Sequence, residues 1–181
     1  MRVIAGEFRS RKLKSIPGDA TRPTPDRLRE ALFNILQTRI EGATFLDAYA
    51  GTGAVAIEAL SRGAKHAYLL ERARPALEAI RENLVALHLE SRATVIPGPV
   101  LKTIAQQKAD IVFLDPPYSL EREYTAILQT LGEAPPPLVI VQHTIHRKLD
   151  ERYGDLKRTR HLRQSDNALT FYAPEAPPGV D

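Results

Sequence analysis

From residue 44 onward, short apolar runs alternate with helix-forming segments, and this alternation is the feature that most limits the possible folds. Strands are expected over 44–50, 67–70, 94–96, 110–114 and 138–141. Helices are expected between them, over 54–61, 74–88, 100–107 and 121–131. Such alternation is typical of a mostly parallel sheet that is covered on both faces. Because ligands of these sheets lie at the carboxyl ends of the strands, the loops there are expected to line one crevice.

Elements of a different kind flank this region. Two more strands are expected over 156–162 and 168–172, around a polar turn. Thr24 can cap a helix whose first position suits Pro25. The expected organisation is a β-hairpin over 1–20, one α/β domain over 21–173 and a flexible tail over 174–181.

Composition excludes several kinds of chemistry. The chain has 181 residues, 43% hydrophobic and 26% charged, as expected for one globular domain. It has no cysteine, which excludes disulfides and the thiol nucleophile that cytosine ring-carbon methylation requires, and which fits a reducing cytoplasm. No apolar stretch is long enough for a signal peptide or a membrane span. The histidines lack metal-ligand spacing, so no metal is expected.

The basic residues are concentrated near the two ends of the chain. Residues 1–16 and 146–163 each carry an excess of positive charge, whereas the middle is close to neutral. This distribution suggests a polyanionic partner. The residues predicted to contact nucleic acid are Arg9, Arg11, Lys12, Lys14, Arg22, Thr24 and Arg27.

The loop after the first strand of the alternating region reads Asp47-Ala48-Tyr49-Ala50-Gly51-Thr52-Gly53. Its glycines let the backbone turn sharply and approach a ligand closely. Gly51, Gly53 and Ala56 also satisfy the dinucleotide-binding pattern, with Glu71 available for a ribose. However, the negative charge of Asp47 favours a cation and is poorly placed beside a pyrophosphate.

S-adenosylmethionine, which carries a sulfonium and an amino-acid head but no phosphate, suits this loop better. Asp47 can answer the positive charge, the glycine backbone can pass along the methionine portion, and Glu71 can accept both ribose hydroxyls. The predicted cofactor-binding residues are Asp47, Ala48, Ala50, Gly51, Thr52, Gly53, Glu71, Arg72, Pro99 and Asp115.

A second motif, Asp115-Pro116-Pro117-Tyr118, follows the fourth strand of this region. Its prolines lock the turn and remove two amide donors, which leaves the Asp115 carboxylate and the Pro116 carbonyl as acceptors. Two acceptors can hold both hydrogens of a nucleobase amine and direct its lone pair at a methyl carbon, while Tyr118 stacks on the flipped base. We therefore predict that Asp115, Pro116, Pro117 and Tyr118 form the reaction centre.

Three further segments resemble the bacterial RsmD family: 1–9 (MRVIAGEFR), 22–34 (RPTPDRLREALFN) and 58–64 (EALSRGA). The resemblance implies methylation of the exocyclic N2 of one guanine in small-subunit (16S) ribosomal RNA. It also implies a Rossmann-like class I S-adenosylmethionine-dependent methyltransferase with a mixed seven-stranded sheet and a small N-terminal β-hairpin that helps hold RNA. The sequence departs from many relatives at Pro97-Gly98-Pro99, where an acidic residue near the adenine is common. Adenine contacts are therefore expected from the backbone there or from elsewhere.

Two other functions remain open on the sequence. An adenine-N6 methyltransferase on DNA or RNA could use the same tetrad, although no separate domain is available to read a DNA sequence. A NAD-binding oxidoreductase would use Gly51, Gly53 and Ala56. The leading interpretation is a cytoplasmic monomer that acts on small-subunit ribosomal RNA or an assembling 30S particle.

Overall fold

The structure, a computed structural model, describes residues 1–16 and 25–175. Its strands are β1 (Thr44–Asp47), β2 (His66–Glu71), β3 (Ala93–Pro97), β4 (Ile111–Leu114), β5 (Leu138–Thr144), β6 (Arg152–Tyr153), β7 (Leu156–Gln164) and β8 (Asn167–Pro174). Its α-helices are α1 (Asp26–Leu36), α2 (Ala54–Ser61), α3 (Arg74–Ala86), α4 (Val100–Thr103) and α5 (Glu121–Glu133). Two 3₁₀ turns complete the described elements, η1 (Glu90–Arg92) and η2 (Ile104–Gln106).

The described strands form one mixed sheet in the order β3-β2-β1-β4-β5-β8-β7-β6. The first five in this order are parallel, and β8, β7 and β6 add to them antiparallel. The expected α/β class is therefore confirmed. The described sheet has eight strands rather than the expected seven, because the two-residue β6 pairs with the start of β7.

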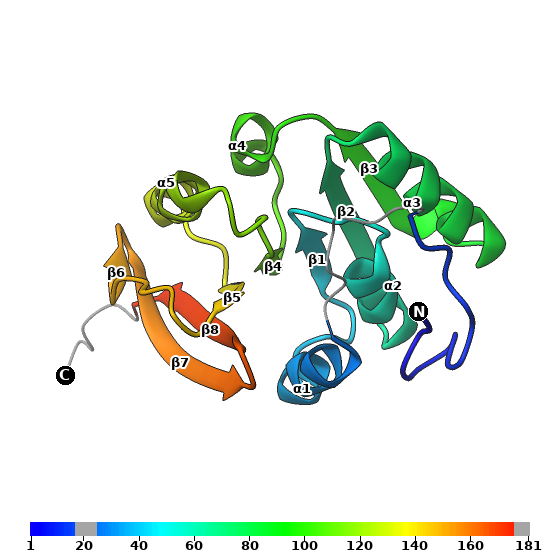
Figure 1. The fold of residues 1–181 in the computed structure, drawn as a ribbon, viewed down its shortest axis with the longest axis horizontal. Coiled ribbons are helices and arrows are strands. Elements are labelled where there is room, and N and C mark those ends of the chain that lie inside the picture. The colour runs from blue at the N-terminus through cyan, green and yellow to red at the C-terminus, as the bar shows by residue number, and fades with distance from the viewer. Residues whose placement is uncertain (17–24, 176–181) are drawn as a thin grey trace.

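The helices cover both faces of the sheet (Figure 1). Each face has its own apolar core. On one face, α1, α2 and α3 pack on strand residues such as Phe45, Phe113 and Ile140. On the other face, α4 and α5 pack on residues such as Leu46, Leu114 and Val141. Successive strand residues thus alternate between two cores, which explains why these strands read as continuous apolar runs.

Some element boundaries differ from the expected ones. Strand β1 ends at Asp47 instead of continuing to residue 50, because the glycine loop begins there. The helix expected over 100–107 is α4 followed by the 3₁₀ turn η2. Pro25 is the N-cap of α1, with an extended ψ of 138°, rather than its first helical residue. Residues 17–24, including the predicted cap Thr24, lie outside the described part of the chain.

The N-terminal segment 1–16 folds back on itself, but it does not form two regular strands. Within it, a single antiparallel bridge joins Arg2 and Lys12, and backbone hydrogen bonds connect Val3 with Ser10 and Arg11. Val3 and Leu13 are buried in the core below. The segment is therefore a looped hairpin that packs on the domain.

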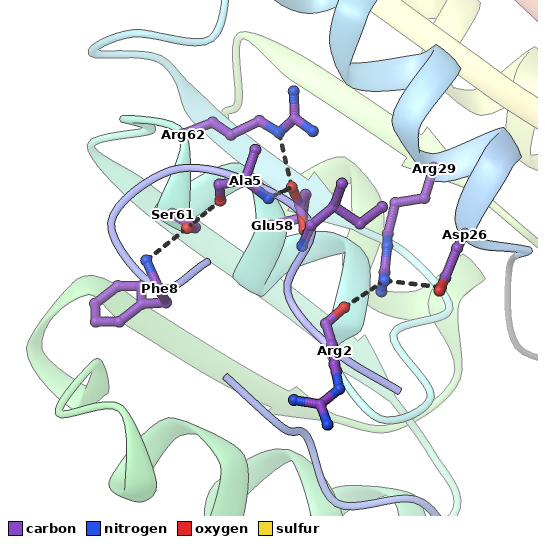
Figure 2. A network of polar contacts seen from close by, with 9 residues as sticks. Arg2, Ala5, Phe8, Asp26, Arg29, Glu58, Ser61 and Arg62 are labelled. Atoms are coloured by element: carbon purple, nitrogen blue, oxygen red, sulfur yellow. Dashed lines mark hydrogen bonds and ion pairs between the residues drawn. The ribbon is translucent and has the colours of Figure 1, made fainter. Parts of the chain in front are cut away.

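Helix α2 holds this segment in place through side chains that point toward it (Figure 2). The buried carboxylate of Glu58 accepts the backbone N–H groups of Ile4 and Ala5, at 2.8 and 3.0 Å. The Ser61 hydroxyl accepts the Phe8 N–H and donates to the Ala5 carbonyl. Gly6 adopts φ +84°, and a Cβ there would lie 1.9 Å from the Ser61 carbonyl oxygen. The backbone of the segment is thus fixed at several points on one helix.

At the other end, part of the expected flexible tail is ordered. Pro174 belongs to β8, and the Glu175 carboxylate pairs with Arg152 and Lys157, at 2.7 and 3.1 Å. Residues 176–181 are not described, so the division of the chain into domains stays a prediction. Within the described residues, no helix combines the length and the apolar character needed to span a membrane.

Candidate active site

A cavity of about 560 Å³ lies at the carboxyl ends of the parallel strands, where the sequence predicted a crevice. Five of its polar residues come from five neighbouring strands: Glu71, Asp47, Asp115, Gln142 and Asn167. Glu71 ends β2, Asp47 ends β1, Asp115 follows β4, Gln142 lies in β5, and Asn167 begins the antiparallel β8. The sheet therefore brings these side chains to one edge on adjacent strands, which are about 5 Å apart. Asp47 lies deeper than Glu71 and Asp115, because it is opposite Leu69 and Phe113.

Most of the predicted cofactor and reaction-centre residues share this cavity. The lining includes Asp47, Ala50, Gly51, Thr52, Glu71, Arg72, Pro99, Asp115, Pro116, Pro117 and Tyr118. Two predicted residues are not part of the lining. Ala48 is fully buried and donates its N–H to the Phe113 carbonyl, and Gly53 is the left-handed N-cap of α2. Both residues support the backbone of the glycine loop without lining the cavity.

The glycine loop and Glu71 hold each other in position. One oxygen of the Glu71 carboxylate accepts the Gly51 N–H at 2.9 Å, and the other accepts the N–H groups of Arg72 and Ala73. Gly51 has φ +56°, and a Cβ built there meets nothing within 4 Å. The loop thus has room for a ligand to pass close to its backbone, beside a carboxylate of fixed orientation.

Asp47 lies at the bottom of the cavity as a buried carboxyl group. It is 1% exposed, one of its oxygens accepts the Ala56 N–H at 3.3 Å, and Oδ1 has no hydrogen-bond partner. Burial raises the pKa of Asp47 to about 8. The charges of Asp115 and Glu71 also raise it, whereas the backbone N–H groups of Ala56 and Tyr49 lower it. An unpartnered buried carboxyl oxygen beside two other carboxylates favours a cationic ligand.

The Asp115-Pro116-Pro117-Tyr118 turn is held by contacts that the sequence analysis missed. The buried Tyr124 hydroxyl donates to the Pro116 carbonyl at 2.9 Å, and the Tyr118 hydroxyl donates to Asn167 Oδ1 at 2.8 Å. Arg147 lies over the Tyr124 ring, 4.1 Å from its centroid, and donates to the Tyr118 carbonyl at 3.2 Å. The turn is therefore fixed on both sides of its two prolines.

Several cavity residues had no signal in the sequence analysis. Met1 and Pro25 line the cavity from the N-terminal side, and Gln142 and Asn167 line it from β5 and β8. Gln142 stands in an apolar strand and Asn167 in a polar turn, so neither belongs to a motif. Tyr124 lies in α5 and Arg147 follows β5. The sequence alone does not show that either residue packs against the tetrad.

The turn after β3 lines the opposite end of the cavity from Asn167. Gly98 has φ +130° with open space around its Cβ position, and it donates its N–H to the Glu71 carbonyl at 3.0 Å. Pro99, Val100 and the 41% exposed Leu101 complete this end. The lining there is apolar side chains and backbone, as expected from the missing acidic residue.

Those predicted nucleic-acid residues that the structure describes lie outside the main cavity. Arg9, Arg11, Lys12 and Lys14 are exposed on the N-terminal segment, where Arg11 also donates to the Ala86 carbonyl and Lys14 pairs with Glu82. Arg27 lines a second cavity of about 440 Å³ between α1 and the β7–β8 turn. Arg22 and Thr24 fall outside the described residues.

The basic C-terminal region is more strongly paired with acidic side chains. Its cations that form ion pairs are Arg147, Arg152, Lys157 and Arg158. In the described ranges 1–16 and 25–175, no group of three or more histidine and acidic side chains could hold a metal ion.

Comparison with known proteins finds one matching family and several similar proteins. The profile of the family described as "Conserved hypothetical protein 95" matches residues 1–173. YlbH of Bacillus subtilis is 35% identical over 169 residues, which span 88% of this chain and 91% of YlbH. A Haemophilus influenzae protein named Ribosomal RNA small subunit methyltransferase D is 39% identical over 132 residues, 70% of this chain and 68% of that protein.

Several solved structures are also similar to this chain. The Escherichia coli protein yhhF has a TM-score of 0.82 at 32% identity, over 98% of this chain and 99% of that one. An RNA methyltransferase from Salinibacter ruber, in complex with S-adenosyl-L-homocysteine, shares the fold, with a TM-score of 0.67 at 17% identity. That similarity covers 88% of this chain and 99% of the Salinibacter chain.

Proposed function

Because this chain belongs to the Conserved hypothetical protein 95 family, which is the RsmD family, we propose that it is a ribosomal RNA methyltransferase. Its fold is the expected class I S-adenosylmethionine-dependent methyltransferase fold. We further propose that it transfers a methyl group to the exocyclic N2 of one guanine in small-subunit ribosomal RNA. The observation that carries this proposal is the single cavity shared by Asp47, Glu71 and the Asp115 turn.

The residues of the cavity fit S-adenosyl-L-methionine. The Asp47 carboxyl suits its positive charge. The Glu71 carboxylate already accepts three backbone N–H groups, so it retains acceptor capacity for one ribose hydroxyl rather than both. Gly51 leaves room for close approach, and the turn at Gly98 and Pro99 offers backbone groups and apolar surface to the adenine. When bound, this cofactor supplies the electrophilic methyl group.

The Asp115 turn fits a planar amine. Asp115 follows β4, which pairs directly with β1, so its carboxylate is on the strand next to Asp47. The Pro116 carbonyl has two lone pairs, of which Tyr124 occupies one, so it can still accept an amine hydrogen. Asp115 and Pro116 would thus hold the amine for in-line displacement, with positioning as the main contribution to rate. Asp115 is also placed to accept the proton that the amine loses.

A base can enter this pocket only after leaving its helical stack, at a cost of a few kcal/mol. Tyr118, 36% exposed at the rim, offers a ring for stacking, worth ~1–3 kcal/mol. Arg9, Arg11, Lys12 and Lys14 would neutralise phosphates and orient the RNA without reading its sequence. We place this activity in the cytoplasm, on small-subunit RNA or an assembling 30S particle, with the protein acting as a monomer.

Ligand-induced stabilisation tests the cofactor. S-adenosyl-L-homocysteine at 100 times its dissociation constant should stabilise the protein by ~2.7 kcal/mol, whereas NAD should not. Stabilisation by NAD alone would favour an oxidoreductase and reject this proposal.

Methyl transfer tests the substrate. The protein is incubated with tritiated S-adenosyl-L-methionine and either undermethylated small subunits or deproteinised RNA, and the labelled nucleosides are identified. We expect N2-methylguanosine. The tetrad also suits the N6 amine of adenine, so labelled N6-methyladenosine would support that alternative instead.

A further inference from the structure

Gln142 is a buried polar residue that the proposed reaction has not yet used. Its side chain is 3% exposed, it lines the main cavity, and its Oε1 has no hydrogen-bond partner. Native proteins pair nearly all buried polar side-chain atoms, so an unpaired one needs an explanation. Since the cavity is where a substrate would lie, a partner that arrives with the substrate is such an explanation.

The register of the sheet puts Gln142 beside the reaction centre. Strands β4 and β5 are parallel, with Phe113 opposite Ile140 and Leu114 opposite Val141. Continuing this register by one position sets Asp115 next to Gln142. Along the strand order, the two carboxylates assigned to the cofactor, Asp47 and Glu71, lie on the other side of Asp115. Gln142 is thus on the side of Asp115 that the cofactor leaves to the base.

The chemistry of guanine supplies the missing partner. In guanine, the amine on C2 is next to N1–H, a hydrogen-bond donor, and O6 lies beyond it as an acceptor. In adenine, the ring atom next to the N6 amine is N1, which is an acceptor. With the amine held by Asp115 and Pro116, an amide on the neighbouring strand would lie along this edge of the base. Its oxygen, a buried atom without a partner, matches N1–H once rotation of the terminal amide turns it toward the cavity.

We propose that Gln142 reads the base edge beside the methylated amine, its Oε1 accepting guanine N1–H and its amide N–H donating to O6. Gln142 is then a specificity-determining residue that favours guanine over bases with an acceptor at that position. This inference rests on the proposed guanine-N2 activity and adds how the pocket selects guanine.

The test uses two RNAs that differ at one base. Once the nucleotide that the wild-type protein methylates has been located, small-subunit RNA is prepared by splinted ligation with either guanine or 2,6-diaminopurine there. 2,6-Diaminopurine keeps the 2-amine but has an acceptor at N1 and an amine in place of O6. For each enzyme, the ratio of kcat/KM on the two RNAs is measured. Effects of the base change on RNA structure cancel when this ratio is compared between enzymes.

The variants are Gln142→Met, which keeps the length of the side chain but removes its polar atoms, and Gln142→Leu as a second apolar replacement. Gln164→Met is the matched control, because Gln164 also has an unpartnered Oε1 but lines the second cavity. The wild type should prefer guanine by roughly ten- to a hundredfold, as for one good base-edge contact. Both Gln142 variants should lower this preference about tenfold or more, and Gln164→Met should leave it unchanged.

The outcomes separate this inference from the activity on which it rests. If the wild type makes no N2-methylguanosine, the proposed function itself fails. If N2-methylguanosine forms and folded Gln142 variants keep the wild-type ratio, Gln142 does not read the base. Equal loss of activity on both RNAs would likewise assign Gln142 a structural role and overturn the inference.

Discussion

The Tyr124 hydroxyl donates a hydrogen bond to the carbonyl oxygen of Pro116 at 2.9 Å, inside the packed face of α5. Arg147 covers the same ring and donates to the carbonyl of Tyr118. The turn that we propose as the reaction centre is therefore oriented by an aromatic side chain that does not line the cavity. Its two prolines limit the backbone, and Tyr124 fixes the direction of the acceptor between them.

We expect Tyr124→Phe to lower kcat about tenfold, because a small misplacement of the Pro116 carbonyl weakens its hold on the amine. The dissociation constant of S-adenosyl-L-homocysteine should stay within twofold, since Asp47 and Glu71 are untouched. Single-turnover methylation and calorimetric titration measure the two quantities. Unchanged kcat would show that the Tyr124 hydroxyl serves packing alone. Thr130→Val is a control, since it removes a hydroxyl of the same helix that bonds only within that helix.

Cofactor affinity should depend on pH through Asp47. Burial, followed by the charges of Asp115 and Glu71, raises the pKa of Asp47 to about 8, so the carboxyl is mostly neutral at pH 7 without ligand. A cation binds its ionised form, so affinity should rise by up to about tenfold per pH unit below 8 and level off above it. Asp47→Asn should bind weakly and lose this dependence, while titration of the cofactor's own amine affects both proteins alike. Titration calorimetry from pH 6 to 9 measures the cofactor affinity of the wild type and of Asp47→Asn. If the two affinities changed with pH in the same way, Asp47 would have no role in cofactor binding.

The same shift has a defined sign for stability. An acid whose pKa is higher in the folded than in the unfolded state favours folding at low pH, and this contribution is lost as pH rises through the folded pKa, here about 8. Asp47→Asn should therefore raise the Tm of the unliganded protein more at pH 9 than at pH 6. Equal changes at both values would mean that Asp47 is not ionising in this range.

RNA binding should respond to the exposed cations of the N-terminal segment. Arg11→Glu with Lys12→Glu should weaken binding of a 16S RNA transcript and reduce the salt slope of log K by about two units. Lys65→Glu with Lys108→Glu is the matched control, because both lysines are exposed near the amino ends of β2 and β4, away from the cavity. Filter binding at several salt concentrations measures the slopes. Equal slopes for the two double variants would assign Arg11 and Lys12 to an ordinary solvated surface.

The attachment of that segment depends on Glu58. Glu58→Ala leaves the N–H groups of Ile4 and Ala5 without their acceptor and removes the partner of Arg62. We expect a loss of about 2–4 kcal/mol in the free energy of unfolding, measured by urea denaturation. Because the segment carries the exposed cations Arg11 and Lys12, its release should also weaken RNA binding in the protein that remains folded. Glu78→Ala, which removes only an exposed ion pair on the surface of α3, should cost little by comparison.

The sequence was sufficient where local chemistry and strand order determine position. Apolar runs separated by helices predicted the parallel sheet, and the places of Asp47, Glu71 and Asp115 after three such runs predicted their common edge. The pairing of β1 with β4 then follows from the topology of this fold. Each of these inferences needed only periodicity and the residue at a strand end.

What the sequence did not reveal depends on packing between distant segments. Gln142 is the first of three polar residues that end β5, and its significance comes from Asp115, which follows the adjacent strand β4. Tyr124 matters because α5 turns it toward Pro116. Glu58 was a usable signal, since it is a lone charge in an otherwise small and apolar helix, but the N–H groups of Ile4 and Ala5 that it accepts lie more than fifty positions away.

The most direct test of the central claim is the effect of Asp115→Ala on methyl transfer and on cofactor binding, measured on the same preparation. If Asp115 holds the amine beside the cofactor, methyl transfer to undermethylated small-subunit RNA should be abolished while the dissociation constant of S-adenosyl-L-homocysteine changes by no more than a few-fold. Methylation near the wild-type rate would contradict the account.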